Sequence, residues 1–202
     1  MMDLPKNLWS ADRSPEDTRG MYAEWASRYE ADMAEGGYLG ALRTAEALAA
    51  LVGTDVAVHD FGCGTGLAGL SLREAGFDRI DGSDLTPEMI EVAKGKALYR
   101  SLAVSDPDAP ITFADDVGAV CAPGVVSVGA GPASLLGALI DAMRPGTALA
   151  LTLNQDTLKE RSYLQAVADV QIDGRARLEF AEYRRQFTHL DRFATVMAFR
   201  RL

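Results

Sequence analysis

The spacing of hydrophobic residues changes along the chain. Over residues 16–34 and 38–51 apolar side chains recur every three or four positions, a period that predicts two helices. After residue 53, short apolar runs alternate with helical stretches. Residues 1–15 are predicted to be a loose arm and residues 105–123 an irregular connection. The runs predicted as strands cover residues 56–60, 77–84, 99–104, 124–129 and 148–153, and the helices between them begin near residues 67, 87 and 132.

Strict alternation of strands and helices predicts right-handed parallel crossovers and an open α/β sheet. Residues 177–187 and 194–200 depart from this pattern, because two strand-like runs joined by a short polar segment predict an antiparallel hairpin. We therefore predict a Rossmann-like, doubly wound sheet, mostly parallel with a C-terminal antiparallel hairpin, and helices on both faces. It is expected to be a single domain over 1–202, with a helical extension or lid at 1–52 and the Rossmann-like core at 53–202.

Composition narrows the class of protein. The 202 residues are 48% hydrophobic and 24% charged, the balance of a globular domain with a sizeable core. A net charge of −9 opposes a nucleic-acid partner, and the arginines from residue 175 onward are interpreted as polar faces of surface strands. Two cysteines and two distant histidines predict no disulfide scaffold and no metal site. Since neither a secretory signal nor a spanning segment is recognisable, we expect a cytoplasmic protein with no membrane partner.

The strongest chemical signal is a glycine-rich loop. A short apolar strand ends at Asp60, and glycines follow at positions 62, 64 and 66. Glycines permit a tight turn and a close approach to a ligand, and the helix behind them presents free N–H groups. The second strand ends at Asp84, whose carboxylate can accept two hydrogen bonds from a ribose diol. Together these features predict a cofactor that contains a nucleoside.

Two kinds of cofactor compete for such a loop. Residues 64–69, Gly-Thr-Gly-Leu-Ala-Gly, match the G-x-G-x-x-G fingerprint of dinucleotide binding. Asp60 and Gly62 stand ahead of that match, and a carboxylate there faces a pyrophosphate unfavourably but suits a cationic amino-acid group. A hydride-transferring enzyme also usually needs a substrate domain, whereas only a hairpin follows this sheet. These points favour a cofactor with an amino-acid end over a nicotinamide.

The same residues resemble the motifs of a known family. The string HDFGCGTGLAG (59–69) resembles the first motif of the class I S-adenosylmethionine-dependent methyltransferases. IDGSDLTPEMIEVA (80–93) resembles their second-strand motif, in which an acid is followed by an apolar residue and a helix. GVVSVGA (124–130) and MRPGTALALTLN (143–154) resemble their fourth and fifth strands, with an Arg-Pro-Gly turn. The resemblance implies S-adenosylmethionine as the cofactor and S-adenosylhomocysteine as its product.

A subgroup of that family is also indicated. The helix around Tyr22 and the run from Ala93 to Tyr99 are most similar to the methyltransferase-like protein of the Williams–Beuren region and its bacterial relatives. Two departures occur: Gly146-Thr147 replaces the Gly-Gly of the family's turn, and Pro123-Gly124-Val125 replaces the usual Asp-x-Val.

The resemblance implies roles around the methionine and ribose. Asp60 would hold the methionine ammonium, and Asp84 would bind the ribose hydroxyls. The loop residues Gly62, Cys63, Gly64 and Gly66 would give the cofactor a close backbone wall. Each acid also has a plainer interpretation, because Asp60 could cap the following turn and Asp84 the helix that begins at Thr86. Cys63 is interpreted as a packing residue, because nothing cationic near it would lower its pKa.

The resemblance also implies an adenine site and a lid. Leu85 would cover one adenine face, and Asp106 would accept from the adenine amino group. Asp115 or Asp116 takes that role instead if residues 111–115 form the third strand, and Asp106 is otherwise a turn residue. Gly129 and Ala130 would border the sulfonium and the methyl acceptor, and Tyr22 or Tyr29 would form the lid, or else belong to the core. His59 is interpreted as a packed strand residue and His189 as an exposed loop residue.

We therefore expect a methyltransferase that acts on a small molecule, or less favourably on a protein, with no nucleic-acid partner. No catalytic residue is assigned, because a general base is needed only if the nucleophile arrives protonated and no motif marks one. Two alternatives stay open: an NAD(P)-dependent oxidoreductase, and a catalytically inactive S-adenosylmethionine-binding protein.

Overall fold

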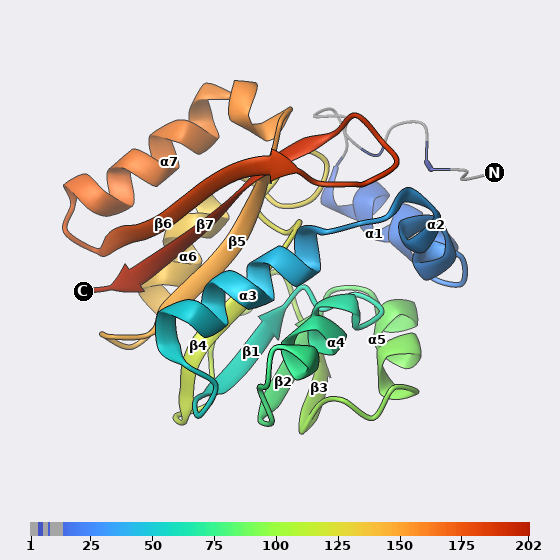
Figure 1. The fold of residues 1–202 in the computed structure, drawn as a ribbon, viewed down its shortest axis with the longest axis horizontal. Coiled ribbons are helices and arrows are strands. Elements are labelled where there is room, and N and C mark those ends of the chain that lie inside the picture. Colours follow the sequence, from blue (N-terminus) through green and yellow to red (C-terminus); the bar gives the residue numbers. More distant parts are fainter. Residues whose placement is uncertain (1–3, 6–7, 9–13) are drawn as a thin grey trace.

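Seven strands form a single sheet in the computed structural model, which describes residues 4–5, 8 and 14–202. They are β1 (Ala57–Phe61), β2 (Ile80–Asp84), β3 (Ser101–Val104), β4 (Val117–Ala122), β5 (Ala148–Asn154), β6 (Ala176–Arg185) and β7 (Phe193–Arg201). Their order is β3-β2-β1-β4-β5-β7-β6 (Figure 1). The strands from β3 to β5 pair in parallel, whereas β7 is antiparallel to both β5 and β6. The predicted mostly parallel sheet with a C-terminal antiparallel hairpin is confirmed.

Helices cover both faces of the sheet (Figure 1). They are α1 (Pro15–Trp25), α2 (Tyr29–Gly36), α3 (Gly40–Val52), α4 (Leu67–Glu74), α5 (Pro87–Lys94), α6 (Ser134–Ala142) and α7 (Arg161–Ile172), with a 3-10 turn η1 at Thr157–Lys159. In the part of the chain that the structure describes, no helix has the length and apolar character needed to cross a membrane.

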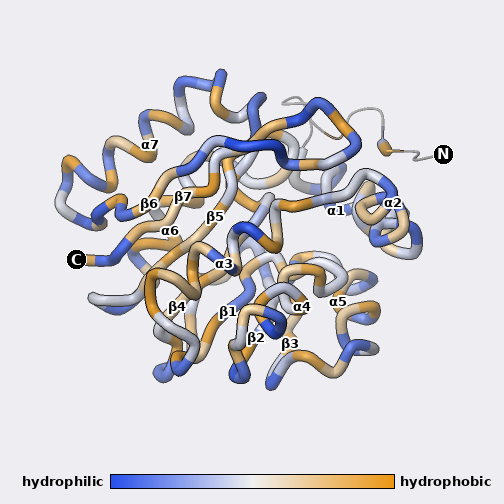
Figure 2. Tube along the Cα trace, viewed as in Figure 1, coloured by the Kyte–Doolittle hydropathy of each residue, from blue (hydrophilic) through white to orange (hydrophobic). Residues whose placement is uncertain are grey.

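The side-chain alternation of the central strands explains the two helical layers. Along β5, Leu149, Leu151 and Leu153 pack with α6 and α7, whereas Ala148 and Ala150 pack with α3. Figure 2 shows β5 as a hydrophobic strand at the centre of the sheet, with hydrophilic positions along the outer β6. The small alanines let α3 approach the sheet closely, and the leucines fill the thicker layer on the opposite face.

The N-terminal segment differs from the prediction. Residues 16–34 were predicted as one helix but form α1 and α2, because a turn at 26–28 separates them. The turn lets the buried Trp25 donate from Nε1 to Oδ2 of the buried Asp32 at 2.7 Å. In a straight helix, residues seven apart lie about 10 Å apart along the axis, so a continuous helix would break this bond. The predicted arm at 1–15 lies mostly outside the described residues.

The fourth strand lies earlier than predicted. Residues 117–122 form β4 between β1 and β5, whereas residues 124–129, predicted as a buried strand, form turns. Gly124 and Gly129 have φ values of 78° and 83°, which regular strands do not adopt. The apolar run between these two glycines was therefore misinterpreted, and the prediction that residues 105–123 are irregular throughout is wrong.

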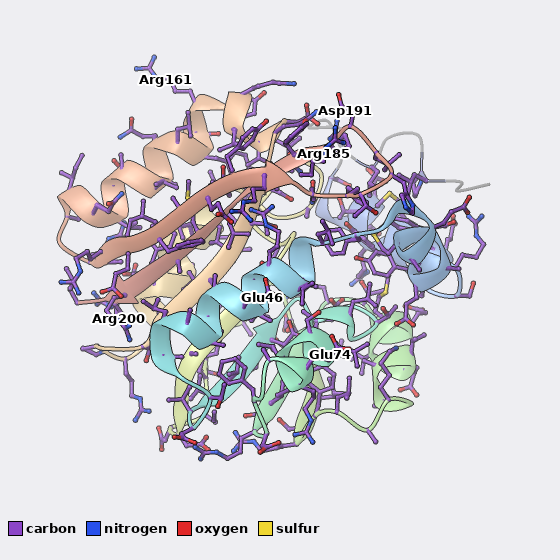
Figure 3. All side chains as sticks on the ribbon, viewed as in Figure 1. Glu46, Glu74, Arg161, Arg185, Asp191 and Arg200 are labelled. Atoms are coloured by element: carbon purple, nitrogen blue, oxygen red, sulfur yellow. The ribbon has the colours of Figure 1, made fainter. Side chains whose placement is uncertain are left out.

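Carboxylates neutralise the arginine-rich end of the chain. Ion pairs join Arg175 to Asp141, Arg177 and Arg200 to Glu179, Arg184 to Glu182, Arg185 to Asp191, and Arg192 to Asp156. Figure 3 shows Arg185 and Asp191 together near the turn of the β6–β7 hairpin. Arg177, Arg184, Arg185, Arg200 and Arg201 lie on β6 and β7, as predicted, whereas Arg175 and Arg192 precede these strands.

Candidate cofactor site

The glycine loop joins β1 to α4 at the carboxyl edge of the parallel strands. The N–H groups of Gly62 and Cys63 both donate to the Ser83 carbonyl oxygen on β2, at 2.8 and 2.9 Å. The Gly64 N–H donates to Asp84 Oδ2 at 2.8 Å. These three bonds hold the loop against the end of β2, so that both acidic strand-end residues lie beside it.

The carboxyl group of Asp60 is buried beneath the loop. The residue is 0% exposed, and its Oδ2 accepts from the Tyr99 hydroxyl at 2.7 Å. Its Oδ1 is buried without a hydrogen-bond partner among the described residues. Burial raises the pKa of Asp60 to about 7; the Tyr99 hydrogen bond opposes the rise, the charge of Asp84 adds to it, and the nearby N–H of Gly69, which makes no well-formed hydrogen bond to Oδ1, opposes it weakly. A buried carboxylate with one unpartnered oxygen is matched by a cationic donor such as an ammonium group.

Asp84 has a structural role beside its predicted one. While Oδ2 accepts from Gly64 N–H, Oδ1 accepts from Thr86 N–H at 2.8 Å and so caps the start of α5. Burial raises the pKa of Asp84, and these two N–H donors oppose the rise. Each carboxylate oxygen has a second acceptor position, so the capping role and binding of a ribose diol are compatible.

Two glycines of the loop serve different purposes. Gly62 and Gly64 both have positive φ, 70° and 53°. A Cβ on Gly62 would lie 2.5 Å from Val125 Cγ2, so the loop after β4 fills the space beside Gly62. A Cβ on Gly64 would meet no described atom within 4 Å. The room for a ligand therefore lies on the Gly64 side of the loop, next to Asp84.

We expect Gly62→Ala to destabilise the fold by about 2–4 kcal/mol, because a strained φ adds to the collision with Val125. Gly174→Ala is the matched control, since Gly174 has a similar φ of 66° but open space at its Cβ position. That variant should lose only about 1 kcal/mol. Urea unfolding compares the two variants, and equal losses would show that Val125 does not constrain the loop.

Helices α1 and α2 lie beside the glycine loop. Ring centroids are 6.5 Å apart between Tyr22 and Tyr29 and 4.9 Å apart between Trp25 and Tyr29. This aromatic cluster packs in the same apolar group as Leu67, the first residue of α4. Burial raises the pKa of Tyr29, and the negative charge of Asp84 contributes to the rise. Both predicted lid residues therefore lie near the loop and also belong to a packed cluster.

Lys96 connects the helical cover to the loop. Its Nζ donates to the Thr65 carbonyl oxygen at 2.7 Å and pairs with Glu30 of α2 at 2.5 Å. Lys96 and Tyr99 both lie in the connection from α5 to β3, and neither was predicted as a site residue. The signal was present, because both belong to the run from Ala93 to Tyr99 that carried the subgroup resemblance.

The residues predicted to bind adenine lie at two different edges of the sheet. Leu85 follows β2 and is 43% exposed, and Asp106 follows β3, where its Oδ1 accepts from the Asp108 N–H at 2.9 Å. Asp115 and Asp116 precede β4 and so lie at the opposite, amino edge of the sheet. The alternative with residues 111–115 as the third strand is wrong, because β3 is Ser101–Val104.

Asp116 belongs to an ion-pair network at that amino edge. Its carboxylate accepts from Arg100 Nη1 at 2.7 Å and lies 3.5 Å from Arg79 Nη1. These arginines precede β3 and β2, and their charges lower the pKa of Asp116. The role of the network is to pair charges between strand starts, away from the glycine loop.

Gly129 and Ala130 lie in the loop between β4 and α6. This loop is held to the neighbouring elements, since Gly124 N–H donates to Thr152 Oγ1 at 2.8 Å and Val128 N–H to Thr157 Oγ1 at 2.9 Å. Because the loop follows a parallel strand, it lies at the same edge of the sheet as the glycine loop. Both residues lie in a turn and not, as predicted, at the end of a strand.

Of the remaining candidate side chains, Cys63 and His59 are packed and His189 is not. Burial raises the pKa of the Cys63 thiol, so it is not a reactive thiolate. His59 Nε2 lies 2.9 Å from Ser83 Oγ, its ring contacts Phe113, and burial lowers its pKa to about 4. His189 is exposed, as predicted. Among the described residues, no group of three or more His, Cys, Asp and Glu side chains could hold a metal.

A sulfonium cofactor with an amino-acid end fits these residues. The unpartnered oxygen of Asp60 matches its ammonium, and the open side of Gly64 beside Asp84 matches its ribose. A dinucleotide fits less well, because a pyrophosphate at the glycine loop would face two carboxyl groups. The residues present thus favour the first of the two cofactors.

Comparisons with known proteins agree with this geometry. Residues 59–151 match the family model of a methyltransferase domain. Methyltransferase-like protein 27 of Homo sapiens is 31% identical in an alignment 159 residues long, which covers 73% of this chain and 63% of that protein. The chain thus spans less than two thirds of that relative's length.

Solved structures share the fold at low sequence identity. The [4+2]-cyclase SpnF has a TM-score of 0.67 at 13% identity, over 94% of this chain and 97% of that chain. Magnesium protoporphyrin IX methyltransferase from Synechocystis PCC 6803, with bound S-adenosylmethionine, has a TM-score of 0.57 at 16% identity, over 81% of each chain.

Fold and site together define an α/β protein of the type that binds a nucleoside cofactor at a glycine loop. With the sequence match and the relative added, the findings support a class I S-adenosylmethionine-dependent methyltransferase. The resemblance drawn from its motifs is confirmed.

Proposed function

We propose that the protein transfers the sulfonium methyl group of S-adenosylmethionine to a small-molecule acceptor and releases S-adenosylhomocysteine. The observation that carries this proposal is the buried Asp60 carboxyl below the glycine loop, with one oxygen satisfied by Tyr99 and the other unpartnered among the described residues. The match to a methyltransferase domain and the fold shared with a solved methyltransferase that holds the cofactor support it.

Different residues at the carboxyl edge would bind different parts of the cofactor. Asp60 would hold the ammonium group, and Asp84 the ribose hydroxyls beside the open Gly64. Leu85 is an exposed apolar residue directly after Asp84, as a partner for an adenine face requires. Asp106 has a carboxylate oxygen beyond the one that its own turn uses, and that oxygen would accept from the adenine amino group.

The chain's own residues would mainly position the acceptor and exclude water. When bound, S-adenosylmethionine supplies an electrophilic methyl group, so alignment of a nucleophile matters more than proton transfer. The Tyr22–Trp25–Tyr29 cluster and the Lys96–Glu30 ion pair hold α1 and α2 beside the loop, and we propose that they form its lid. Gly129 and Ala130 would border the acceptor from the loop after β4.

The charge distribution favours a small-molecule acceptor over a nucleic acid. The chain carries a net charge of −9, and carboxylates pair with the arginines of its C-terminal strands. Binding of a phosphate backbone needs clustered cations, which these pairs do not supply.

The test is production of S-adenosylhomocysteine from S-adenosylmethionine with panels of small molecules, a denatured protein mixture and transfer RNA. We expect acceptor-dependent product only with the small molecules, and none from Asp60→Asn. Product with RNA or protein alone would overturn the acceptor class. Binding of the cofactor without product from any panel would favour the inactive binding protein.

A further inference from the structure

Tyr99 occupies a slot made by glycines on three elements. A Cβ on Gly69 of α4 would lie 2.2 Å from the Tyr99 hydroxyl oxygen, and a Cβ on Gly82 of β2 would lie 2.8 Å from its ring carbon Cε1. A Cβ on Gly66 of the loop would lie 3.4 Å from its ring. Glycine weakens the interior of a helix or a strand, so the space that Tyr99 needs accounts for Gly69 and Gly82. Gly69 is also the last glycine of the apparent dinucleotide fingerprint, which thus has a different purpose here.

The backbone that presents Tyr99 is itself unusual. Ala97 has a φ of 51°, the one positive value outside glycine in the part of the chain described. Such a conformation is strained for a residue other than glycine and persists where surrounding contacts determine it. Here those contacts lie on both sides, because Lys96 bonds to Thr65 of the loop and Tyr99 bonds to Asp60.

The hydrogen bond to Asp60 has a defined direction. Burial and the charge of Asp60 raise the pKa of Tyr99, so its hydroxyl stays protonated and donates to the carboxylate. Asp60 Oδ2 is satisfied in this way, and Oδ1 is left as the acceptor without a partner among the described residues. The torsion of the carboxyl group is thus fixed by a side chain outside the glycine loop.

We propose that Tyr99 is a positioning residue of the cofactor site, which orients the Asp60 carboxylate so that its second oxygen can bind the cofactor's ammonium group. The inference rests on the proposed function for the identity of that ligand. The orientation of Asp60 by Tyr99 is a property of the free protein and can be tested without a ligand.

The first measurement is a carbon-13 NMR titration of the Asp60 carboxyl group in the free wild type and in Tyr99→Phe, assigned with Asp60→Asn. Because a donated hydrogen bond favours the charged form, its loss should raise the pKa of Asp60. The other titratable groups that influence Asp60 or are influenced by it are unchanged in the variant, namely Asp84, Cys63, Cys121 and Tyr38. An unchanged midpoint would overturn the proposal.

The second measurement is calorimetric binding of S-adenosylhomocysteine from pH 6.5 to 8.5. Tyr99→Phe should weaken binding about tenfold at pH 7, as expected for a lost hydrogen bond to a charged group. The loss should be larger at pH 6.5 than at pH 8.5, because the variant's Asp60 is less ionised there. A loss independent of pH would indicate a merely structural role and contradict the proposal.

Two further variants control for packing. Gly69→Ala should displace the phenol from its slot and raise the pKa of Asp60 in the same direction as Tyr99→Phe. Tyr183→Phe, on the exposed face of β6, should change neither the Asp60 titration nor binding. If the wild type fails to bind S-adenosylhomocysteine, the proposed function fails, while the titration of free Asp60 still decides the role of Tyr99.

Discussion

Asp60→Asn is expected to weaken binding of S-adenosylhomocysteine by about 2–4 kcal/mol, or roughly 30- to 1000-fold, the cost of removing one charge from a buried pair. Asparagine keeps the size of the side chain and can still accept from the Tyr99 hydroxyl. The loss of affinity therefore measures the effect of the charge that faces the ammonium group, and not a change in the shape of the site. Calorimetric titration at pH 7.5 measures it.

The same variant should be more stable than the wild type at alkaline pH. The pKa of Asp60 is raised by burial from the usual 3.8 to about 7, so the folded state disfavours the ionised form. The wild type accordingly loses stability, relative to Asp60→Asn, as pH rises from about 4 to about 7, and the difference is constant above that range. Urea unfolding at pH 5 and pH 8 checks the sign. If the variant is less stable than the wild type at pH 8, the ionised Asp60 does not destabilise the free protein, and the prediction is wrong.

Asp84→Ala is expected to weaken binding of the cofactor product by about 1.5–3 kcal/mol, through loss of charged hydrogen bonds to the ribose. Unlike a purely ligand-binding residue, Asp84 also accepts from Gly64 and Thr86 N–H groups. We therefore expect the free energy of unfolding to fall by about 1–2 kcal/mol as well, as for the loss of a helix cap.

Asp78→Ala is the matched control for Asp84→Ala. Asp78 lies just before β2 at the opposite edge and pairs with Arg73 on an exposed surface. Its removal should alter neither binding nor stability by more than about 0.5 kcal/mol. Unaltered cofactor affinity in Asp84→Ala, with an intact fold, would refute the ribose assignment.

The α/β frame was predictable because its elements carry strong local signals. The run ending at Asp60 and the helix start near Pro87 were identified from their local patterns, and β1 and α5 lie there. The error at β4 has a physical cause. Its sequence, Val-Gly-Ala-Val-Cys-Ala, is built of small residues suited to a crowded central position, whereas the more apolar Val125–Val128 is bent by glycines on either side.

One missed element carried a legible signal. No element was predicted between residues 154 and 176, although Tyr163, Ala166, Val167 and Val170 repeat at helical spacing and form the packed face of α7. The break between α1 and α2 is different, because neither glycine nor proline marks it. It follows from the long-range packing of Trp25 and Asp32, which local pattern does not encode.

Site residues within a sequence motif were predictable, whereas contacts that depend on the packing of separate segments were not. Asp60, Gly64 and Asp84 meet at the loop because parallel strands end at one edge. The contact of Gly62 with Val125 and the Tyr99 slot depend on how three separate segments pack, and a sequence shows only glycines at those positions. The exposed Asp106 stays a prediction for the adenine site.

The central claim is that this glycine loop holds a sulfonium cofactor with an amino-acid end. Calorimetric titration of the wild-type chain with S-adenosylhomocysteine and, separately, with NADH tests it most directly. We expect binding of S-adenosylhomocysteine at micromolar concentration and no heat of binding with NADH. Binding of NADH alone would contradict the account and assign the loop to a dinucleotide.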